Sequence, residues 1–208
     1  VKKSERKKIL LLSDDLRMHS GIATMSRELV VGSAHKYNWF QVGAALKHPD
    51  KGKVIDISDD VNKNSGIKDS QVHIMPFEGY GNSTLIRSLL EKEKPDAIFI
   101  FTDPRYWIWL FEIEREVRNN IPIVWLNIWD DYPAPIYNRD YYNSVDCLMG
   151  ISKQTVNINK LVLGDDAIDK VINYVPHGIN NKHFFPIVKD NPLYPELIKF
   201  KDKTIDNP

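Results

Sequence analysis

Short apolar stretches of the sequence are followed directly by side chains that can bind a ligand. The first stretch leads into Ser20 and Gly21, which open a predicted helix. Glycine lets a ligand approach the backbone, and the first N–H groups of a helix lack helical partners, so this pair can hold a phosphate. Helix capping by the Ser20 hydroxyl is the alternative interpretation. The polar residues just before the pair are Asp14, Asp15, Arg17 and His19.

A pair of carboxylates, Asp130 and Asp131, lies between Trp129 and Tyr132 after another apolar stretch. Carboxylates accept hydrogen bonds from sugar hydroxyls, and the flanking aromatic rings can stack on a sugar ring. The same residues suit an ordinary turn, because Asp side chains bond nearby backbone and two prolines follow. Carbohydrate contact and simple turn formation are both compatible with this segment.

Two further polar sets follow other apolar stretches. Asp103 and Arg105 are suited to bind a ligand together, or to pair with each other across a turn. His177, followed by Gly178 and Asn180, is suited to donate to an anion, or to be a solvated loop histidine. Each set therefore has one functional and one purely local interpretation.

The elements that must position these side chains alternate between strand and helix patterns. Strands are predicted at 8–13, 39–46, 72–75, 97–101, 122–128, 147–150 and 171–175, and helices at 21–36, 83–93, 106–119 and 152–163. This alternation with short connections predicts an α/β fold, a doubly wound parallel sheet of Rossmann-like type covered on both faces. The ligand crevice of such a sheet lies at the carboxyl ends of its strands, where all the polar sets above should converge.

Composition excludes several functional classes. The 208 residues carry 28 basic and 28 acidic side chains and a net charge of +0, so a general nucleic-acid binder is not expected. The one cysteine, Cys147, excludes an internal disulfide framework and a cysteine-rich zinc site. The sequence shows no metal-binding, nucleotide-loop or GxGxxG motif, so no metal and no cofactor are predicted. With no apolar run of membrane-spanning or signal-peptide length, we expect a cytoplasmic protein.

Two stretches allow a membrane contact that nothing else in the sequence supports. The aromatic run at 106–111 suits an interfacial helix, although such a stripe is more often core. The basic start, residues 2–8, suits anionic lipid, although such a run is more often a solvated tail. Peripheral membrane association is therefore kept only as an alternative.

Five segments in order resemble the amino-terminal half of a GT-B glycosyltransferase of the large retaining family four. They are SGIATMSRELV (20–30), KPDAIFIFTDP (94–104), IPIVWLNIWDDYPAP (121–135), VDCLMGISKQTVNINKL (145–161) and VPHGINNKHFFP (175–186). The last is the most specific. The resemblance implies an acceptor-side domain over 1–186 and a linker over 187–208 that leads to an absent carboxyl-terminal, donor-binding domain.

The resemblance also implies a function and roles for residues. The complete enzyme would move a sugar from a nucleotide-sugar to a glycan, lipid or small-molecule acceptor with retention, and this chain alone would be inactive. Ser20 and Gly21 would contact the donor phosphates, and His177, Gly178 and Asn180 would line the cleft and hinge. The acceptor site would hold Asp103, Arg105, Trp129 and Tyr132. Many members carry a histidine in the loop where this chain has Trp129-Asp130-Asp131, so Asp130 and Asp131 become the candidate catalytic residues.

Three other functions are compatible with parts of the pattern. The same fold can serve as a non-catalytic sugar- or nucleotide-binding module. A GT-B nucleotide-sugar epimerase would turn over its substrate with no acceptor present. A response-regulator receiver domain would need an aspartate where this sequence has Phe101, which disfavours it.

Overall fold

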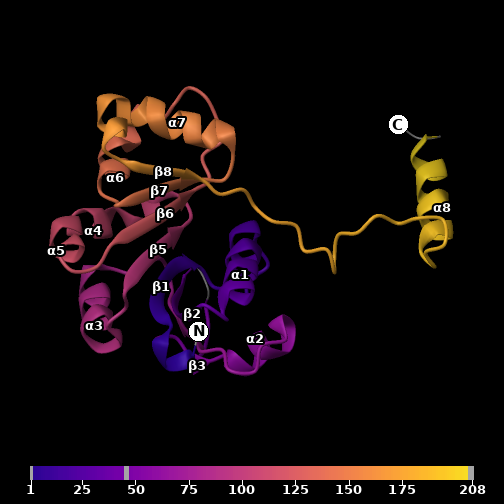
Figure 1. Ribbon diagram of the computed structural model, residues 1–208, viewed down its shortest axis with the longest axis horizontal. Coiled ribbons are helices and arrows are strands. Elements are labelled where there is room, and N and C mark those ends of the chain that lie inside the picture. Colours follow the sequence, from indigo (N-terminus) through magenta and orange to yellow (C-terminus); the bar gives the residue numbers. More distant parts are fainter. Residues whose placement is uncertain (1, 45–46, 206–208) are drawn as a thin grey trace. The chain divides into compact units, whose positions relative to one another are not determined.

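An eight-stranded sheet organises most of the chain (Figure 1). This computed structural model describes residues 2–44 and 47–205. It divides into two units, one ending at His177 and one beginning at Gly178. The strands are β1 (Lys7–Asp14), β2 (Tyr37–Ala44), β3 (Ile55–Asp56), β4 (Val72–Pro76), β5 (Ala97–Phe101), β6 (Ile123–Asn127), β7 (Cys147–Gly150) and β8 (Val171–Tyr174).

The helices of the larger unit follow the strands they connect. They are α1 (Gly21–Ser33), α2 (Ser58–Ser65), α3 (Ser83–Glu93), α4 (Ile108–Phe111), α5 (Glu114–Arg118), α6 (Arg139–Asn143) and α7 (Lys153–Leu163). Short 3-10 turns are η1 (Lys3–Glu5), η2 (Pro104–Trp107), η3 (Ile136–Asn138) and η4 (Gly164–Ile168). The predicted α/β, Rossmann-like architecture is confirmed.

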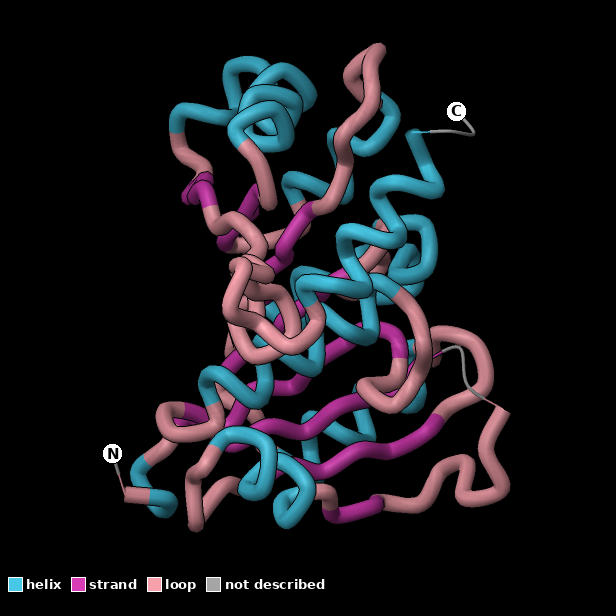
Figure 2. Tube along the Cα trace, turned by 90° about the vertical axis from the view of Figure 1, so that its right-hand side faces the viewer, coloured by secondary structure: helices cyan, strands magenta, loops and turns pink. Residues whose placement is uncertain are grey.

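The strand order is β3-β4-β2-β1-β5-β6-β7-β8, and among these strands only the β3–β4 pairing is antiparallel. Figure 2 shows strands of the sheet side by side, with helices and loops around them. From β1 the chain winds outward through β2 and β4, and from β5 it winds the other way to β8. The direction of winding therefore changes between β1 and β5. In a doubly wound sheet this switch point is where a crevice opens.

Alternation along β1 explains the two hydrophobic clusters. Leu10 and Leu12 face the larger cluster, with side chains from α3 to α7, whereas Leu11 faces the smaller cluster with α1 and α2 (Figure 1). The smaller cluster extends only as far as β5, and beyond it Val124 and Cys147 on that face remain partly exposed. The sequence predicts helices over both faces of the sheet. The structure has a full layer of helices on one face and a partial layer on the other.

The prediction of one continuous helix over 106–119 is wrong. The chain forms η2, then α4, then α5, with a break at Glu112–Ile113. Trp107, Leu110 and Phe111 are buried early in this stretch, and Val117 alone is buried in α5. The aromatic run is therefore mostly core, the interpretation that the sequence favoured.

The polar region 47–66 forms the edge strand β3, which lies within a weak strand signal at 54–57, and helix α2, which the sequence does not indicate. In α2, Val61 is buried and Gly66 ends the helix in a left-handed conformation. The strand predicted at 39–46 is observed as β2, and its last two predicted residues lie outside the described part of the chain.

The second unit contains helix α8 (Tyr194–Ile205). This helix lies within the segment 187–208 that the sequence predicts to be a linker, and the linking role itself stays a prediction. Side chains exposed in this unit include Phe184, Phe185 and Phe200.

Candidate functional site

The loops that follow β1, β5 and β6 form one edge of the sheet (Figure 1). These strands are parallel neighbours in the order β1-β5-β6, so their carboxyl ends lie side by side. Asp14 ends β1, and Thr102 and Asp103 come directly after β5. The sets chosen from the sequence around Ser20, Asp103 and Asp130 are therefore carried by adjacent loops, as expected.

Ser20 caps helix α1. Its Oγ accepts from Ala23 N at 3.0 Å and donates to Asp14 Oδ2 at 2.8 Å. The capping interpretation is thus confirmed, and it does not compete with anion binding, because the N–H groups of Gly21 and Ile22 precede the first helical bonds. A Cβ added at Gly21 meets no described atom within 4 Å. Phosphate binding here stays a prediction.

Asp15 fixes Arg17 beside this loop. The carboxylate is 0 % exposed and accepts from Arg17 Nε at 2.9 Å and Nη2 at 2.8 Å. The hydrogen bond to Asp15 is the main cause that raises the pKa of Arg17. Arg17 is therefore a permanently charged group in one defined orientation, since the buried carboxylate has no other described cation.

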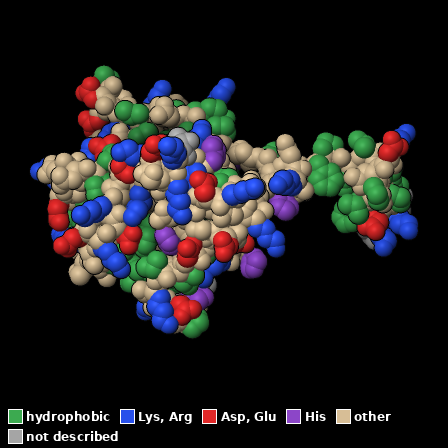
Figure 3. All heavy atoms as spheres, turned by 60° about the horizontal axis from the view of Figure 1, so that its bottom comes forward, with side chains coloured by type: hydrophobic (Ala, Val, Ile, Leu, Met, Phe, Trp, Pro, Cys, Tyr) green, Lys and Arg blue, Asp and Glu red, His purple; other side chains and the backbone are tan. Residues whose placement is uncertain are grey.

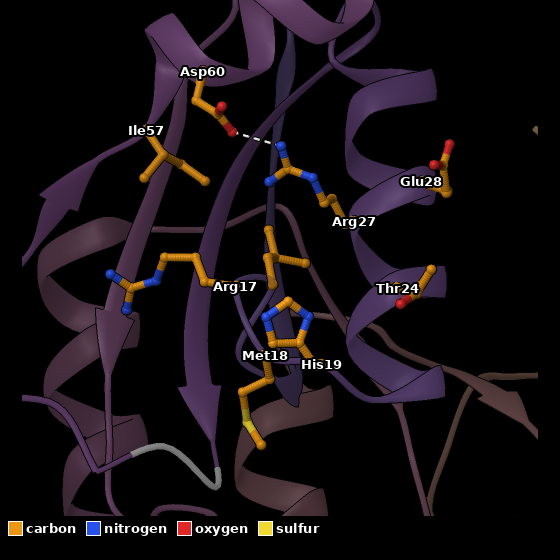
Figure 4. Close-up of a pocket in the computed structure, with 9 residues that line it drawn as sticks. Arg17, Met18, His19, Thr24, Arg27, Glu28, Ile57 and Asp60 are labelled. Carbon is orange, nitrogen blue, oxygen red and sulfur yellow. Dashed lines mark hydrogen bonds and ion pairs between the residues drawn. The ribbon is translucent and has the colours of Figure 1, made fainter. Parts of the chain in front are cut away.

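A hollow of about 520 Å³ opens between α1 and the segment that carries Ile57 and Asp60, next to the same loop (Figure 4). Arg17, His19 and Arg27 bring basic groups to it, and Arg27 is paired with Asp60 at 2.7 Å. The sequence signals Arg17 and His19 only by their position after β1. Arg27 has no sequence signal, because it reaches the hollow through the turn of α1.

Asp103 and Arg105 form a closed local pair. Asp103 Oδ1 accepts from Arg105 N and Nε, each at 2.9 Å, and Oδ2 accepts from Nη2 at 2.9 Å. Asp103 thereby caps η2, and its hydrogen bond to Arg105, followed by its charge, raises the pKa of Arg105. The ion-pair interpretation is confirmed, and a joint contact with an acceptor stays a prediction.

The loop after β6 presents its carboxylates to solvent. Asp130, Asp131 and Tyr132 are exposed, and Trp129 is partly buried. Asp131 Oδ1 accepts from Tyr132 N at 2.8 Å, and Trp129 Nε1 donates to the Asp131 carbonyl at 3.0 Å. Gln154 of α7 donates to the Asp130 carbonyl at 2.7 Å. The turn chemistry is observed, and it leaves the Asp130 carboxylate at the surface.

A buried amide supports this loop from beneath. Asn127 Oδ1 accepts from Trp129 N at 3.1 Å, while Nδ2 donates to Tyr142 Oη at 2.9 Å and to Asn159 Oδ1 at 2.6 Å. Burial raises the pKa of Tyr142 to about 12, so its hydroxyl stays protonated. This network links α6 and α7 to the loop, and no local sequence pattern reveals it.

Leucine at Asn127 is expected to destabilise the domain by about 2 kcal/mol, because buried polar groups of Trp129, Tyr142 and Asn159 lose their partner. Urea denaturation measures the change in the free energy of unfolding. The control is Asn157→Leu, an exposed residue whose one described bond is to Tyr132 Oη, with an expected change within about 0.5 kcal/mol. Equal effects of the two variants would show that the network does not support the loop.

His177 returns to the middle of this edge although it follows the outermost strand, β8. Its ring meets Phe101, the last residue of β5, edge-on with centroids 5.7 Å apart. Partial burial lowers the pKa of His177, which favours the neutral ring. Gly178 and Asn180 belong to the second unit, where Asn180 closes a turn by accepting from Lys182 N at 3.0 Å. Their cleft and hinge roles stay predictions.

Two tyrosines at this edge, Tyr80 and Tyr106, are not predicted as site residues from the sequence. Tyr80 Oη donates to Asp14 Oδ1 at 3.2 Å, and its ring stacks on Tyr106. Tyr80 follows β4 in a loop whose two glycines signal a turn, and Tyr106 lies inside the aromatic run assigned to the core. No local pattern indicates that these residues meet.

Within the described ranges, no His, Cys, Asp and Glu side chains gather in a group able to hold a metal ion. No helix in the same ranges has both the length and the apolar character needed to cross a bilayer. Acidic and basic side chains are interspersed on the face shown in Figure 3. Comparison with known proteins gives no match to any protein-family model and no match to any curated protein.

Proposed function

We propose that this chain is the acceptor-side, amino-terminal domain of a retaining GT-B glycosyltransferase that uses a nucleotide-sugar. The observation that carries the proposal is the convergence of three loops at one sheet edge: Ser20–Gly21, Asp103–Arg105 and Trp129–Tyr132. The return of His177 to the end of β5 adds to it, because His177 belongs to the most specific segment of the resemblance. The proposed location is the cytoplasm.

The donor diphosphate would lie against the start of α1. Partial positive charge at a helix start favours a phosphate, and the open space at Gly21 leaves room for close approach. Arg17, held by Asp15, adds a fixed positive charge near this loop. These features would stabilise charge on the diphosphate as it leaves.

The reaction needs positioning more than a strong base. The bond from the anomeric carbon to the diphosphate breaks, and the acceptor oxygen bonds to the same face of that carbon. The acceptor proton passes to the departing diphosphate. This chain would hold the acceptor hydroxyl, through Asp130 or Asp131, and orient it toward the anomeric carbon.

Replacing Asp130 or Asp131 with asparagine is expected to raise the acceptor KM about tenfold in the complete enzyme, because one charge-assisted hydrogen bond is weakened. The donor KM should not change. Steady-state kinetics with each substrate varied in turn measures both. Asp165→Asn is the control, an exposed carboxylate in η4 at the far end of α7. Unaltered acceptor kinetics for both site variants would remove these residues from the site.

The test of the function compares the product of the complete reading frame with the 208-residue chain. Each is incubated with UDP-, GDP- and dTDP-linked hexoses, with and without glycan and lipid acceptors. Transfer by the complete product and none by this chain is the expected result. Turnover without acceptor would indicate an epimerase, and binding without turnover would indicate a binding module. Either outcome contradicts the proposal.

A further inference from the structure

Tyr80 and Tyr106 form a stacked aromatic pair at the switch point of the sheet. Their ring centroids are 3.9 Å apart and their planes differ by 11°. Tyr106 is nevertheless 42 % exposed. Tyr80 covers one face of the Tyr106 ring, so the exposed surface of Tyr106 lies away from Tyr80. Tyr106 is thus a partly exposed aromatic residue that is backed by a second ring.

Local backbone geometry holds this pair in place. Tyr80 lies between Gly79 and Gly81, whose φ angles of +80° and +89° only glycine adopts readily. A Cβ at Gly81 would lie 3.3 Å from Trp109, so the loop is packed closely on that indole. Trp107 meets the Tyr80 ring edge-on at 5.4 Å. The stacked pair of Tyr80 and Tyr106 is therefore formed before any ligand binds.

Polar groups surround the pair. The Tyr80 hydroxyl is anchored on Asp14, which is 8 % exposed. Asp103 lies at the start of the turn that carries Tyr106, whose N–H donates to the Asp103 carbonyl at 3.3 Å. Arg105, bound to Asp103, keeps most of its side chain exposed. Acceptors and donors are thus available around the exposed ring.

We infer that the exposed face of Tyr106, backed by Tyr80, binds a pyranose ring whose hydroxyls contact Asp103 and Arg105. This inference rests on the proposed function and makes the acceptor a carbohydrate, either a free glycan or the head group of a glycolipid. An aromatic face with polar groups at its rim suits the apolar face and hydroxyl edge of a sugar.

Two other occupants fit these residues less well. An acyl chain would bury the charges of Asp103 and Arg105 without replacing their hydrogen bonds to water, which is costly. A nucleotide could stack its base on Tyr106, but its phosphates would be repelled by the carboxylate of Asp103. A neutral sugar avoids both penalties.

The test measures binding of the purified 208-residue chain to an array of oligosaccharides. The array covers neutral hexoses, N-acetylhexosamines, pentoses and uronic acids, each as a free glycan and as a glycolipid. Tyr106→Ala should weaken every bound glycan about tenfold, and Tyr106→Phe should keep most of the affinity, because the stacking face remains. The matched control is Tyr37→Ala. Tyr37 is a 38 % exposed tyrosine in contact with Trp39 at the start of β2, on the opposite edge of the sheet.

Several results would overturn the inference. The first is that the chain binds no glycan on the array. The second is that the wild type and Tyr106→Ala bind the glycans equally well. The third is that UDP alone displaces the bound glycan. Saturation-transfer NMR on the bound glycan supplies a second readout, since ring protons over Tyr106 should lose their signal enhancement in the alanine variant. Because no donor is present, glycan binding without transfer by the complete enzyme would reject the proposed function and leave this subsite standing. Transfer by the complete enzyme that is unaffected by Tyr106→Ala would reject this subsite and leave the proposed function standing.

Discussion

Leucine in place of Gly21 is expected to leave the domain folded and to reduce turnover of the nucleotide-sugar about 100-fold in the complete enzyme. A Cβ at this position meets no described atom within 4 Å, so the side chain fits without rearrangement. The added atoms would occupy the space at the start of α1 that the proposal gives to the diphosphate. The loss should therefore appear in donor use, with the free energy of unfolding nearly unchanged.

The matched control for this variant is Gly32→Leu. Gly32 lies in the last turn of the same helix, and a Cβ there also meets no described atom within 4 Å. The two variants add the same side chain to opposite ends of α1, and Gly32→Leu should keep full activity. Kinetics with varied donor and urea denaturation separate the effects. Normal donor KM and kcat in Gly21→Leu would exclude a phosphate site at this helix start.

Alanine in place of Gly43 is expected to destabilise the domain by about 3 kcal/mol. A Cβ on Gly43 would overlap Asp15 Oδ2 and lie 2.8 Å from Asp15 Cγ. Asp15 cannot move aside easily, because it is fully buried and bound to Arg17 at two points. Strand β2 is equally fixed, since Gly43 pairs with Ser13 on one side and Pro76 on the other.

Urea denaturation of Gly43→Ala tests this packing directly. Gly32→Ala is the control, and it should stabilise the chain by about 0.5 to 1 kcal/mol, because alanine favours an exposed helix position over glycine. A Gly43→Ala domain as stable as the wild type would contradict the close approach of Asp15 to β2. It would also remove the argument that Arg17 is held in a single orientation.

Elements with strong local signals could be predicted from the sequence. β5 and β7 are short apolar runs bounded by polar residues, and they begin and end where expected. Helix α7 begins after Ser152, whose Oγ accepts from Thr155 N at 2.9 Å. These signals depend on neighbours a few residues apart. The predictions made from these local signals are confirmed because the tertiary structure favours the same elements.

Elements decided by long-range packing could not be predicted in the same way. The break between α4 and α5 interrupts a run of buried residues that continues at Val117, and neither Glu112 nor Ile113 signals it in the sequence. Helix α2 has one buried apolar residue, Val61, and a polar composition that hides it. Tertiary contacts override weak propensity in both cases.

The same difference between local and long-range contacts applies to the candidate site. The Ser20 cap and the Asp103–Arg105 pair join residues two or three positions apart, so local chemistry proposed them among its alternatives. The contact of Tyr80 with Asp14 spans 66 positions, and His177 meets Phe101 from the far edge of the sheet. Only the order of the strands brings such residues together.

The most direct test of the central claim is the anomeric configuration of the product made by the complete enzyme. The enzyme is incubated with the nucleotide-sugar it consumes and with the glycan that binds this chain, and proton NMR follows the transferred sugar. We predict a new glycosidic bond with the same anomeric configuration as the donor. A product of inverted configuration would contradict the retaining assignment. Absence of transfer from every nucleotide-sugar tested would contradict the glycosyltransferase function itself.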